Sequence, residues 1–497
     1  MQPMPRPWLP ALAAGLLAAA GPALAGRDEL PPAVQAALQQ AGVPAEALAA
    51  VALPLSRWAR PWQYRGEVAM HPGSAMKVVT TVVALDRLGP DHRGWTELRS
   101  DAPIEDGVLR GDLVLKGGAD PELGVPQLWA LLVDLRQLGV HTIAGRLVVD
   151  RTLFRPARPD LGVPPFDEAP EFPYNVIPDA LQLAGNLLPL ELRSGAEVVQ
   201  ASTVPPLDGI TVTSRMALTG TRCDDWDDDW RSARVMPQAG GTVVELNGGF
   251  PRDCTQRTAL QLIDRQELAD KLFRTLWRGL GDRWTGSAVE AAAAADARVL
   301  ARRVSRPWGE LLRHMNKASD NPRARLLYLS LGLADMVDEP QASTAELAER
   351  EVRRWLAEHG IDDSGLVIDN GSGLSRSERI SARQLASLLK VASRGRHAAE
   401  LLASLPLAGV DGTMRQRLRD SPAAGWARLK TGTLRDVVAL AGYVDDADGR
   451  SWAVAMMVNH ANARRAQPVL DALVDGIARH GPHGPPRPSV GPQGDGP

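Results

Sequence analysis

Cysteine is scarce in this sequence of 497 residues, and its scarcity excludes several kinds of site. Only Cys223 and Cys254 are present, and neither stands in a cluster of cysteines and histidines of the kind that binds zinc. Neither cysteine has the surroundings of a nucleophile. We therefore expect no metal and no other cofactor.

An excess of charge of one sign is also missing. The 56 lysines and arginines nearly balance the 59 aspartates and glutamates, for a net charge of -3, so no electrostatic attraction to nucleic acid is expected. With 44% hydrophobic and 23% charged residues, the chain has the composition of a globular protein. Because one hydrophobic core stops growing near ~250 to 300 residues, we expect two or three domains.

Long hydrophobic runs are absent outside the N-terminus. There, Arg6 precedes an apolar stretch from Leu9 to Ala20, and Ala23-Leu24-Ala25 resembles a cleavage site. This pattern predicts a secretory signal peptide over residues 1–25 and an exported protein with at most peripheral membrane contact. The stretch is short for a membrane span, and a retained anchor is the less favoured alternative. Export into an oxidising compartment favours a disulfide between the two cysteines over two free thiols.

Three short strings carry the chemistry, in this order along the chain: Ser74-Ala-Met-Lys77, Ser319-Asp-Asn321 and Lys430-Thr-Gly432. On a helix, residues three apart share a face, so Lys77 can bring its amine beside the Ser74 hydroxyl. A neutral lysine could then take the hydroxyl proton and leave a nucleophilic oxygen. Burial and a second cation, for which Lys430 is the candidate, would lower the pKa of Lys77. The strings together predict a serine acyl-transfer site.

Each string alone has a simpler interpretation. A serine three residues before a lysine is usually a helix N-cap beside a solvated lysine. Ser319-Asp-Asn alone is typical of a turn before a helix, and Lys430-Thr-Gly alone of a strand end. Only the three strings in order point to catalysis.

The segment from Val78 to Leu88, which follows the first string, carries conflicting signals. Its first six residues are all β-branched, which favours a strand. We nevertheless predict a helix, closed by Gly89-Pro90, because only a helical turn places Ser74 beside Lys77. A helix that is apolar all round would be buried at the centre of the protein.

Between about residues 96 and 300 the sequence changes character and reads as an insertion between the strings. A strand, a helix and a second strand are expected over 111–116, 127–138 and 145–150. A proline-rich connection and a β-rich stretch follow. Asp264 to Glu267 then resembles a capping box that starts another helix.

The C-terminal part returns to helical patterns on both sides of Ser319. Three strand-like runs are expected over 426–432, 437–444 and 452–458. They predict an antiparallel meander that carries Lys430 on its first strand. A helix over 468–478 closes the region before a tail rich in glycine and proline.

The three motif types occur together in class A β-lactamases and penicillin-binding proteins. The 245 positions from Ser74 to Ser319 exceed the spacing in class A β-lactamases. In this the chain resembles the low-molecular-mass class C penicillin-binding proteins, the D-alanyl-D-alanine carboxypeptidase/endopeptidases with a large insertion. Four further segments carry the likeness: Gly117–Pro121, Asp369–Arg376, Leu405–Thr413 and Lys430–Leu434. It is weakest over 51–70, where the family has a strand pair and this chain reads irregularly.

The resemblance implies an α/β (α+β) fold with a β-lactamase/transpeptidase-like core, an antiparallel sheet with helices on both sides, and two smaller inserted domains. Both ends of the chain would build the core. The expected divisions are a signal peptide (1–25), the core (26–95 and 299–480), inserted domain II (96–110 and 176–298), a nested small α/β domain III (111–175) and a disordered tail (481–497).

The resemblance also implies roles for the residues of the strings. Ser74 would be the acylated nucleophile, Lys77 its general base, and Ser319 the relay of a proton to the leaving group. Asn321 would bind the acyl-side amide of the peptide.

The remaining implied roles concern the third string. Lys430 and Thr431 would hold the terminal carboxylate, and Gly432 would let the substrate backbone approach the strand. The backbone N–H groups of Ser74 and Thr433 would form the oxyanion hole.

By the same resemblance, the substrates would be peptidoglycan stem peptides in the periplasm, ending in D-Ala-D-Ala or cross-linked, and β-lactams would acylate the same serine. Asp167 and Glu168 are candidates for substrate specificity. The alternatives are a β-lactamase or esterase on the same fold, or a non-catalytic homologue that binds the cell wall.

Two other features favour structural interpretations. The acidic run Asp224 to Asp229 could bind calcium but is more typical of a solvated loop. His71, close to Ser74 in the sequence, has no identified acidic partner and is expected to be structural.

Overall fold

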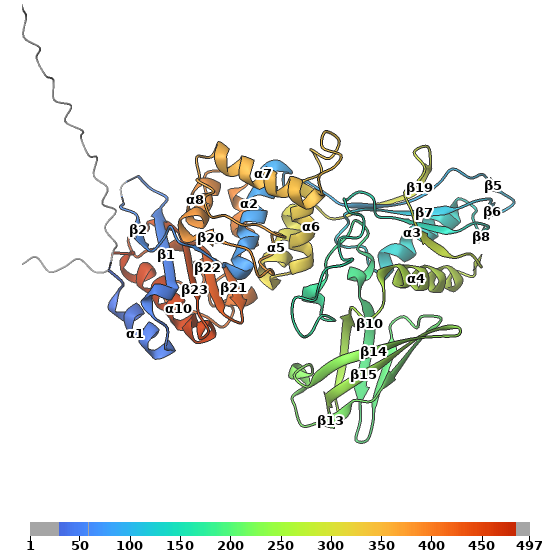
Figure 1. Cartoon of the computed structure of the whole chain (residues 1–497), viewed down its shortest axis with the longest axis horizontal. Coiled ribbons are helices and arrows are strands. Elements are labelled where there is room, and N and C mark those ends of the chain that lie inside the picture. Colours follow the sequence, from blue (N-terminus) through green and yellow to red (C-terminus); the bar gives the residue numbers. More distant parts are fainter. Residues whose placement is uncertain (1–28, 58, 484–497) are drawn as a thin grey trace, which may run out of the picture.

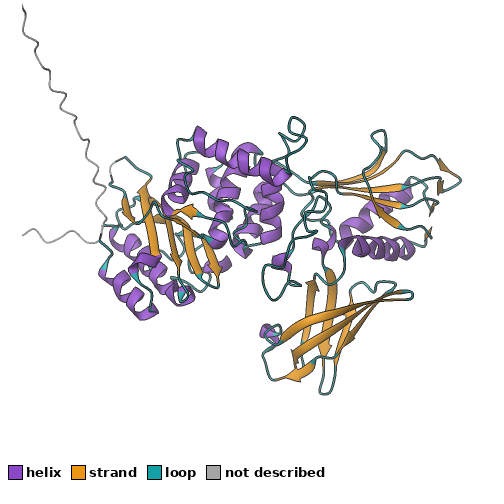
Figure 2. Cartoon of the chain, viewed as in Figure 1, coloured by secondary structure: helices purple, strands orange, loops and turns teal. Residues whose placement is uncertain are grey.

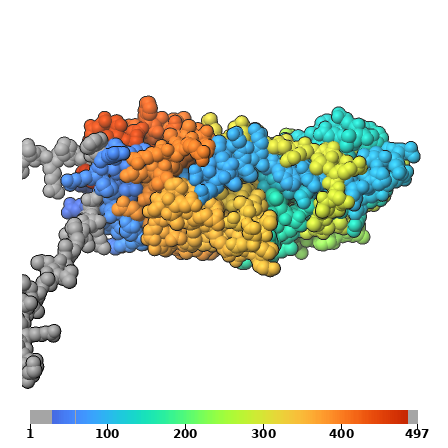
Figure 3. Space-filling view, turned by 90° about the horizontal axis from the view of Figure 1, so that it is seen from above, coloured from blue at the N-terminus to red at the C-terminus, as the bar shows by residue number. Residues whose placement is uncertain are grey.

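The structure is a computed structural model that describes residues 29–57 and 59–483 (Figure 1). The expected signal peptide, and the expected tail from residue 484 onward, lie outside the described residues. Over the described residues the molecule is elongated, with the core at one end and the inserted region at the other (Figure 3). None of the helices in this described part combines the length and the hydrophobicity that a membrane span requires.

A five-stranded antiparallel sheet forms the centre of the core. Its strands, in spatial order, are β2 (Trp62–Tyr64), β1 (Leu48–Pro54), β23 (Ser451–Asn459), β22 (Val437–Asp445) and β21 (Arg428–Leu434). The predicted antiparallel meander is confirmed by the last three strands. The stretch over 51–70, which reads irregularly in the sequence, contributes to the β1–β2 pair. It reads irregularly because β1 is buried on both faces and therefore lacks the polar alternation of a half-exposed strand.

Helices cover both faces of this sheet (Figure 2). One face packs against α1 (Pro32–Ala41) and α10 (Gln467–His480). The other face packs against a helical lobe: α2 (Lys77–Arg87), α5 (Trp308–Ala318), α6 (Asn321–Leu331), α7 (Thr344–Glu358), α8 (Ala382–Ala392) and α9 (Ala398–Ser404). A small pair, β3 (Ala69–Met70) with β20 (Ile380–Ser381), links the lobe to the segment before Ser74. The observed arrangement is the expected antiparallel sheet between helices.

The helix predicted after Ser74 is confirmed as α2, at the centre of the lobe. Residues 77–85 are all buried, so tertiary packing overrides the strand propensity of the β-branched run. The Thr80 hydroxyl donates to the Gly371 carbonyl at 2.6 Å, which satisfies its polar atom inside the lobe. Ser74 lies on a short 3₁₀ turn, Gly73–Met76, that leads directly into α2.

One part of the inserted region consists of two sheets with two helices packed against them. The five-stranded sheet has the order β18 (Ala288–Glu290), β9 (Leu147–Asp150), β7 (Leu113–Gly118), β4 (Trp95–Ser100) and β19 (Arg298–Val304). The smaller sheet has the order β17 (Arg283–Trp284), β8 (Thr142–Ile143), β6 (Val108–Leu109) and β5 (Ile104–Glu105). The helices are α3 (Val125–Gln137) and α4 (Arg265–Gly279).

The predicted capping box at the start of α4 is only half formed. The Asp264 side chain accepts a hydrogen bond from the Gln266 backbone N–H at 2.7 Å. Glu267 instead accepts from the Thr242 hydroxyl at 2.7 Å, so its carboxylate ties α4 to a neighbouring strand.

A second unit of the inserted region consists almost entirely of strands (Figure 2). A three-stranded sheet has the order β11 (Val199–Thr203), β10 (Leu188–Ser194) and β16 (Thr255–Leu260). In the other sheet, β15 (Gly241–Pro251) pairs with β12 (Ile210–Ser214), β13 (Ala217–Thr219) and β14 (Trp230–Gln238). A disulfide joins Cys223 to Cys254 in this unit, with their Cα atoms 5.5 Å apart.

The sheet pairings suggest another division of the inserted region. The expected boundary between residues 110 and 111 falls inside one sheet, since β7 pairs with β4 on one side and with β9 on the other. Strand β18, far along the chain, pairs with β9 in the same sheet. We therefore propose that residues 95–187 and 261–304 form one α/β unit, and that the β-rich residues 188–260 are the nested one.

Candidate active site

The turn that carries Ser74 packs closely against strand β21. A Cβ atom added to Gly432 would lie 2.2 Å from the Pro72 carbonyl oxygen and 3.1 Å from the Ser74 nitrogen. Only glycine lets the strand reach the turn this closely. A glycine is thus required at position 432 for more than the approach of a substrate, because it lets the first and third strings pack together.

The Lys77 amine has three partners, and two of them can only accept hydrogen bonds from it. Nζ lies 2.6 Å from the Ser372 carbonyl oxygen, 2.6 Å from Asn321 Oδ1 and 2.8 Å from Ser74 Oγ. The Asn321 amide is oriented by its Nδ2, which donates to the Tyr174 carbonyl at 3.1 Å. A neutral amine has two N–H groups, which these two acceptors engage, so its lone pair points at the Ser74 hydroxyl.

The surroundings of Lys77 favour this neutral form. The side chain is 0% exposed, and burial is the largest cause that lowers its pKa well below the usual value. The positive charge of Lys430 lowers the pKa further, while the carboxylates of Glu378 and Asp320 oppose the shift. The structure thus contains both predicted causes of a lowered Lys77 pKa, burial and the nearby cation Lys430.

Ser319 and Lys430 form a second pair beside the first. Ser319 ends α5 in a left-handed conformation, with φ of 60°, and Lys430 Nζ donates to its Oγ at 2.9 Å. Lys430 also donates to the Thr431 carbonyl at 2.8 Å, and burial lowers its pKa to about 7. The Thr431 hydroxyl lies 2.7 Å from that of Thr413, so two hydroxyls line this end of the site. Sequence reasoning assigned no role to Thr413, although it noted the segment that ends there.

Asp320 stands between Ser319 and Asn321 in the second string, and its side chain binds the backbone. Its Oδ1 accepts from the Arg323 N–H at 3.0 Å and so caps α6. The structure thus places Ser319 and Asn321 on either side of a helix cap, as expected for a junction between two helices.

Two backbone N–H groups flank Ser74. A Cβ atom on Gly73 would lie 3.3 Å from the Thr433 nitrogen, and one on Gly432 would lie 3.1 Å from the Ser74 nitrogen. The nitrogens of Ser74 and Thr433 therefore sit on either side of the contact between turn and strand. Ser74 is half-buried and Thr433 is exposed, so the space between them is open to a substrate.

The loop 369–376, for which the sequence suggested no role, positions both Lys77 and the Ser74 turn. Its Ser372 carbonyl accepts from Lys77, and its Ser375 carbonyl accepts from the ring Nε2 of His71. Glu378 anchors the loop from below: its buried Oε1 accepts from the backbone N–H groups of Asp369, Asn370 and Gly371. A main-chain acceptor has no side-chain signature, so only the likeness of this segment to the family could have indicated it.

Replacing Glu378 with leucine is expected to destabilise the protein and slow acylation. Three backbone N–H groups, of which that of Gly371 is buried, would lose their acceptor, at a cost of about 3 kcal/mol in the free energy of unfolding. The displaced Ser372 carbonyl would no longer hold Lys77. Urea unfolding and the rate of labelling by a fluorescent penicillin measure the two effects.

Glu378→Gln is the matched control, because it keeps the acceptor oxygen and the volume. It is expected to retain most of the stability and most of the labelling rate. Equal losses in both variants would show that the carboxylate charge, and not the anchoring of the loop, is what matters.

His71 holds the turn that carries Ser74, and both of its ring nitrogens are engaged by the backbone. Its Nδ1 accepts from the Gly73 N–H at 3.0 Å, which leaves Nε2 as the protonated nitrogen that donates to Ser375. Burial lowers the pKa of His71, in agreement with this neutral form. Asn459 fixes the backbone of His71 through hydrogen bonds of 2.7 and 2.9 Å.

A cavity of about 840 Å³ opens above Ser74. Asp167 and Glu168 line it, opposite Arg376 on the loop and Arg435 after β21. The Asp167 carboxylate accepts from the Tyr174 hydroxyl at 2.8 Å, while exposed Glu168 forms an ion pair with Arg435 at 3.3 Å. The cavity therefore brings both sequence candidates for specificity to the serine.

No grouping of three or more His, Cys, Asp and Glu side chains suited to a metal ion occurs among the described residues. In the run 224–229, Asp229 accepts from the Thr221 hydroxyl at 3.0 Å. Asp224 instead forms an exposed ion pair with Arg222.

Helices on both faces of an antiparallel sheet, with a serine on the turn that leads into the central helix and a buried lysine at the start of that helix, define a serine-type peptidase of the transpeptidase-like class. The family model described as the D-Ala-D-Ala carboxypeptidase 3 (S13) family matches residues 30–479. The chain belongs to this family, and its enzymes are peptidases. The resemblance drawn from the three strings is confirmed.

Relatives and solved structures agree with this assignment. The D-alanyl-D-alanine carboxypeptidase of Actinomadura sp. (strain R39) is 30% identical over 83% of this chain and 77% of its own length. The D-alanyl-D-alanine carboxypeptidase DacB of Haemophilus influenzae is 27% identical over 80% of this chain and 82% of its own. The crystal structure of penicillin binding protein 4 (dacB) from H. influenzae has the same fold, with a TM-score of 0.70 at 24% identity, over 88% of this chain and 97% of that one.

Proposed function

We propose that this protein hydrolyses peptidoglycan stem peptides that end in D-Ala-D-Ala or are cross-linked, through an acyl-enzyme on Ser74. The Lys77 amine carries the proposal, because it is buried, lies 2.8 Å from Ser74 Oγ and has both N–H groups engaged by acceptors. In the neutral form that burial and Lys430 favour, such an amine acts as a base toward the serine. The family to which the chain belongs supports the same substrate class.

In the acylation step, Lys77 takes the proton of the Ser74 hydroxyl as Oγ attacks the carbonyl carbon of the penultimate D-Ala. The oxygen of that carbonyl becomes an oxyanion and accepts hydrogen bonds from the N–H groups of Ser74 and Thr433. Each such donor typically lowers the barrier by about 3 to 4 kcal/mol. Asn321 Nδ2 donates one hydrogen to the Tyr174 carbonyl, and its second hydrogen binds the acyl-side amide of the substrate.

Collapse of the tetrahedral intermediate breaks the C–N bond. The Ser319 hydroxyl passes its proton to the leaving nitrogen, and Lys430, which donates to Ser319 Oγ, replaces that proton. Lys430 and Thr431 hold the carboxylate of the departing residue. Water then adds to the ester carbon as its proton passes to the now neutral Lys430. The bond from that carbon to Ser74 Oγ breaks, and the Lys77 ammonium returns its proton to Ser74 Oγ.

We further propose that β-lactams acylate Ser74 and that the protein works outside the cytoplasm. A second crystal structure of the H. influenzae protein, 23% identical to this chain, holds a β-lactam. The signal-peptide pattern over 1–25 supports export to the periplasm.

Incubating the wild-type protein with a fluorescent penicillin and with purified muropeptides tests the proposal. A long-lived adduct, located on the peptide that contains Ser74 by mass spectrometry, is expected together with release of D-alanine. Rapid turnover of the penicillin would instead indicate a β-lactamase. Complete absence of an adduct and of muropeptide products would indicate a non-catalytic homologue.

A further inference from the structure

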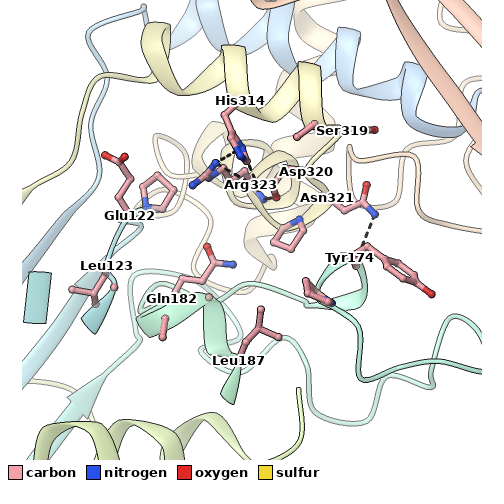
Figure 4. A pocket seen from close by; sticks show the side chains of 17 residues that line it. Glu122, Leu123, Tyr174, Gln182, Leu187, His314, Ser319, Asp320, Asn321 and Arg323 are labelled. Carbon is pink, nitrogen blue, oxygen red and sulfur yellow. Dashed lines mark hydrogen bonds and ion pairs between the residues drawn. The ribbon is translucent and has the colours of Figure 1, made fainter. Parts of the chain in front are cut away.

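A second cavity, of about 470 Å³, meets the active site from the other side of Ser319 and Asn321. It lies between the start of α6 and the loops of the inserted region (Figure 4). Tyr174, Ser319 and Asn321 line both this cavity and the larger one above Ser74. The two cavities are thus the arms of one groove, and the second string lies where they join.

Gln182 is the uncommitted polar group of this second arm. Its side chain is 5% exposed, and its amide points into the cavity (Figure 4). Within residues 29–57 and 59–483, neither amide atom has a hydrogen-bond partner. Buried amides are nearly always hydrogen-bonded, so this one is suited to a partner that enters the cavity. A primary amide both donates and accepts, which complements a secondary amide.

The other polar side chains of the lining already have partners within the protein. Glu122 forms an ion pair with Arg306 at 2.6 Å. His314 and Arg323 contact each other, and the Asp320 carboxylate caps α6 (Figure 4). Apolar side chains, Leu187 among them, make up much of the rest. The arm is therefore nearly neutral, with one amide available for recognition.

The loop that carries Gln182 is held rigidly. The Leu181 N–H donates to Asp179 Oδ1 at 2.8 Å, and the same carboxylate is paired with buried Arg265 at 2.7 Å. After Gln182, the Ala184 N–H donates to the Leu123 carbonyl at 2.7 Å. An amide fixed in this way loses little conformational entropy when it binds a partner.

We propose that this arm binds the leaving strand of a cross-linked peptidoglycan fragment and that Gln182 pairs with a secondary amide of that strand. The proposal rests on the proposed function, because it concerns the same serine. A carboxypeptidase substrate loses a single D-alanine, which Lys430 and Thr431 account for, and would leave the arm empty. Only a substrate with chain on both sides of the scissile bond can occupy both arms of the groove.

Gln182→Met tests the proposal, because methionine keeps the length of the side chain and removes the amide. We expect kcat/KM for a cross-linked muropeptide dimer to fall about tenfold, mainly through a higher KM. Release of D-alanine from a monomeric pentapeptide and acylation by penicillin are expected to match the wild type. Leu187→Phe, which narrows the arm, is expected to give the same selective loss.

Gln137→Met, an exposed glutamine at the end of α3, is the matched control and should change neither reaction. Equal losses on monomer and dimer, or no loss on the dimer, would overturn the proposal. So would a wild-type enzyme that cleaves monomers and leaves dimers intact. A wild type that neither cleaves muropeptides nor binds penicillin would instead contradict the proposed function.

The secondary amide could belong to the peptide or to an N-acetylated sugar of the leaving strand. Comparing dimers with and without their disaccharides distinguishes the two sources. A loss on both kinds of dimer supports a peptide amide, and a loss on the sugar-bearing dimer alone supports an acetamido group.

Discussion

Ser74→Ala is expected to abolish both the penicillin adduct and the release of D-alanine. Removing the nucleophile of a serine peptidase lowers kcat on the order of 10⁶-fold, which here means a fall to the limit of detection. The variant should still fold, because the half-buried hydroxyl contributes one hydrogen bond, to Lys77, worth about 1 kcal/mol. Fluorescence of the labelled protein on a denaturing gel and a muropeptide digest give the two readouts.

Ser287→Ala is a suitable control, since that exposed serine lies in the inserted region and belongs to none of the three strings. It should be labelled like the wild type. A stable penicillin adduct on Ser74→Ala would mean that another group is acylated, and would remove the basis for the mechanism.

Replacing Lys77 is expected to have the next largest effect. Lys77→Met removes the base and should slow acylation by about 10² to 10⁴-fold. Lys77→Arg keeps a positive charge, but a guanidinium cannot give up its proton and should not restore the rate. The measurement is the second-order rate constant for labelling by penicillin, with circular dichroism to establish that both variants are folded.

The dependence of this rate on pH separates a basic role from a structural one. The neutral amine is the active form, so the acylation rate should be highest above the pKa of Lys77 and should fall as the pH drops through that pKa. Because burial and Lys430 lower that pKa well below its usual value, the rate should reach its plateau well below pH ~10. Full activity of Lys77→Arg with an unchanged pH profile would contradict the role of Lys77 as base.

The chemical part of the site could be predicted because its groups are side chains. A serine, two lysines and an asparagine at short, ordered spacings point to their own chemistry, and the structure brings Ser74, Lys77, Ser319 and Lys430 into contact in two pairs. The Ser372 carbonyl could not be predicted in this way, because every residue has a carbonyl. Gln182 gives no signal either, since a lone glutamine has no pattern around it.

Three strands of the core sheet followed from local patterns, and the helix after Ser74 followed from the spacing of Ser74 and Lys77, but the units of the inserted region did not follow from either. Its strands are short, and the partners that decide its units lie far apart, as when β9 pairs with β18. Sequence periodicity is local and cannot report such pairings. Helices α7 and α8 were missed although each begins with a capping box, at Ser343 and Ser381, that a closer reading would have found.

The route of the chain through the core sheet also determines when the enzyme can become active. Strand β1, near the start of the described chain, pairs with β23 near its end, as in the contact of Ala52 with Val454. The third string lies on β21, and it reaches Ser74 only after that C-terminal segment has been made. Closing so long a loop is slow, whereas each unit of the insertion pairs strands among its own residues and can fold earlier. An incomplete chain therefore lacks Lys430 beside Ser74, and the enzyme is inactive until its last strands have folded.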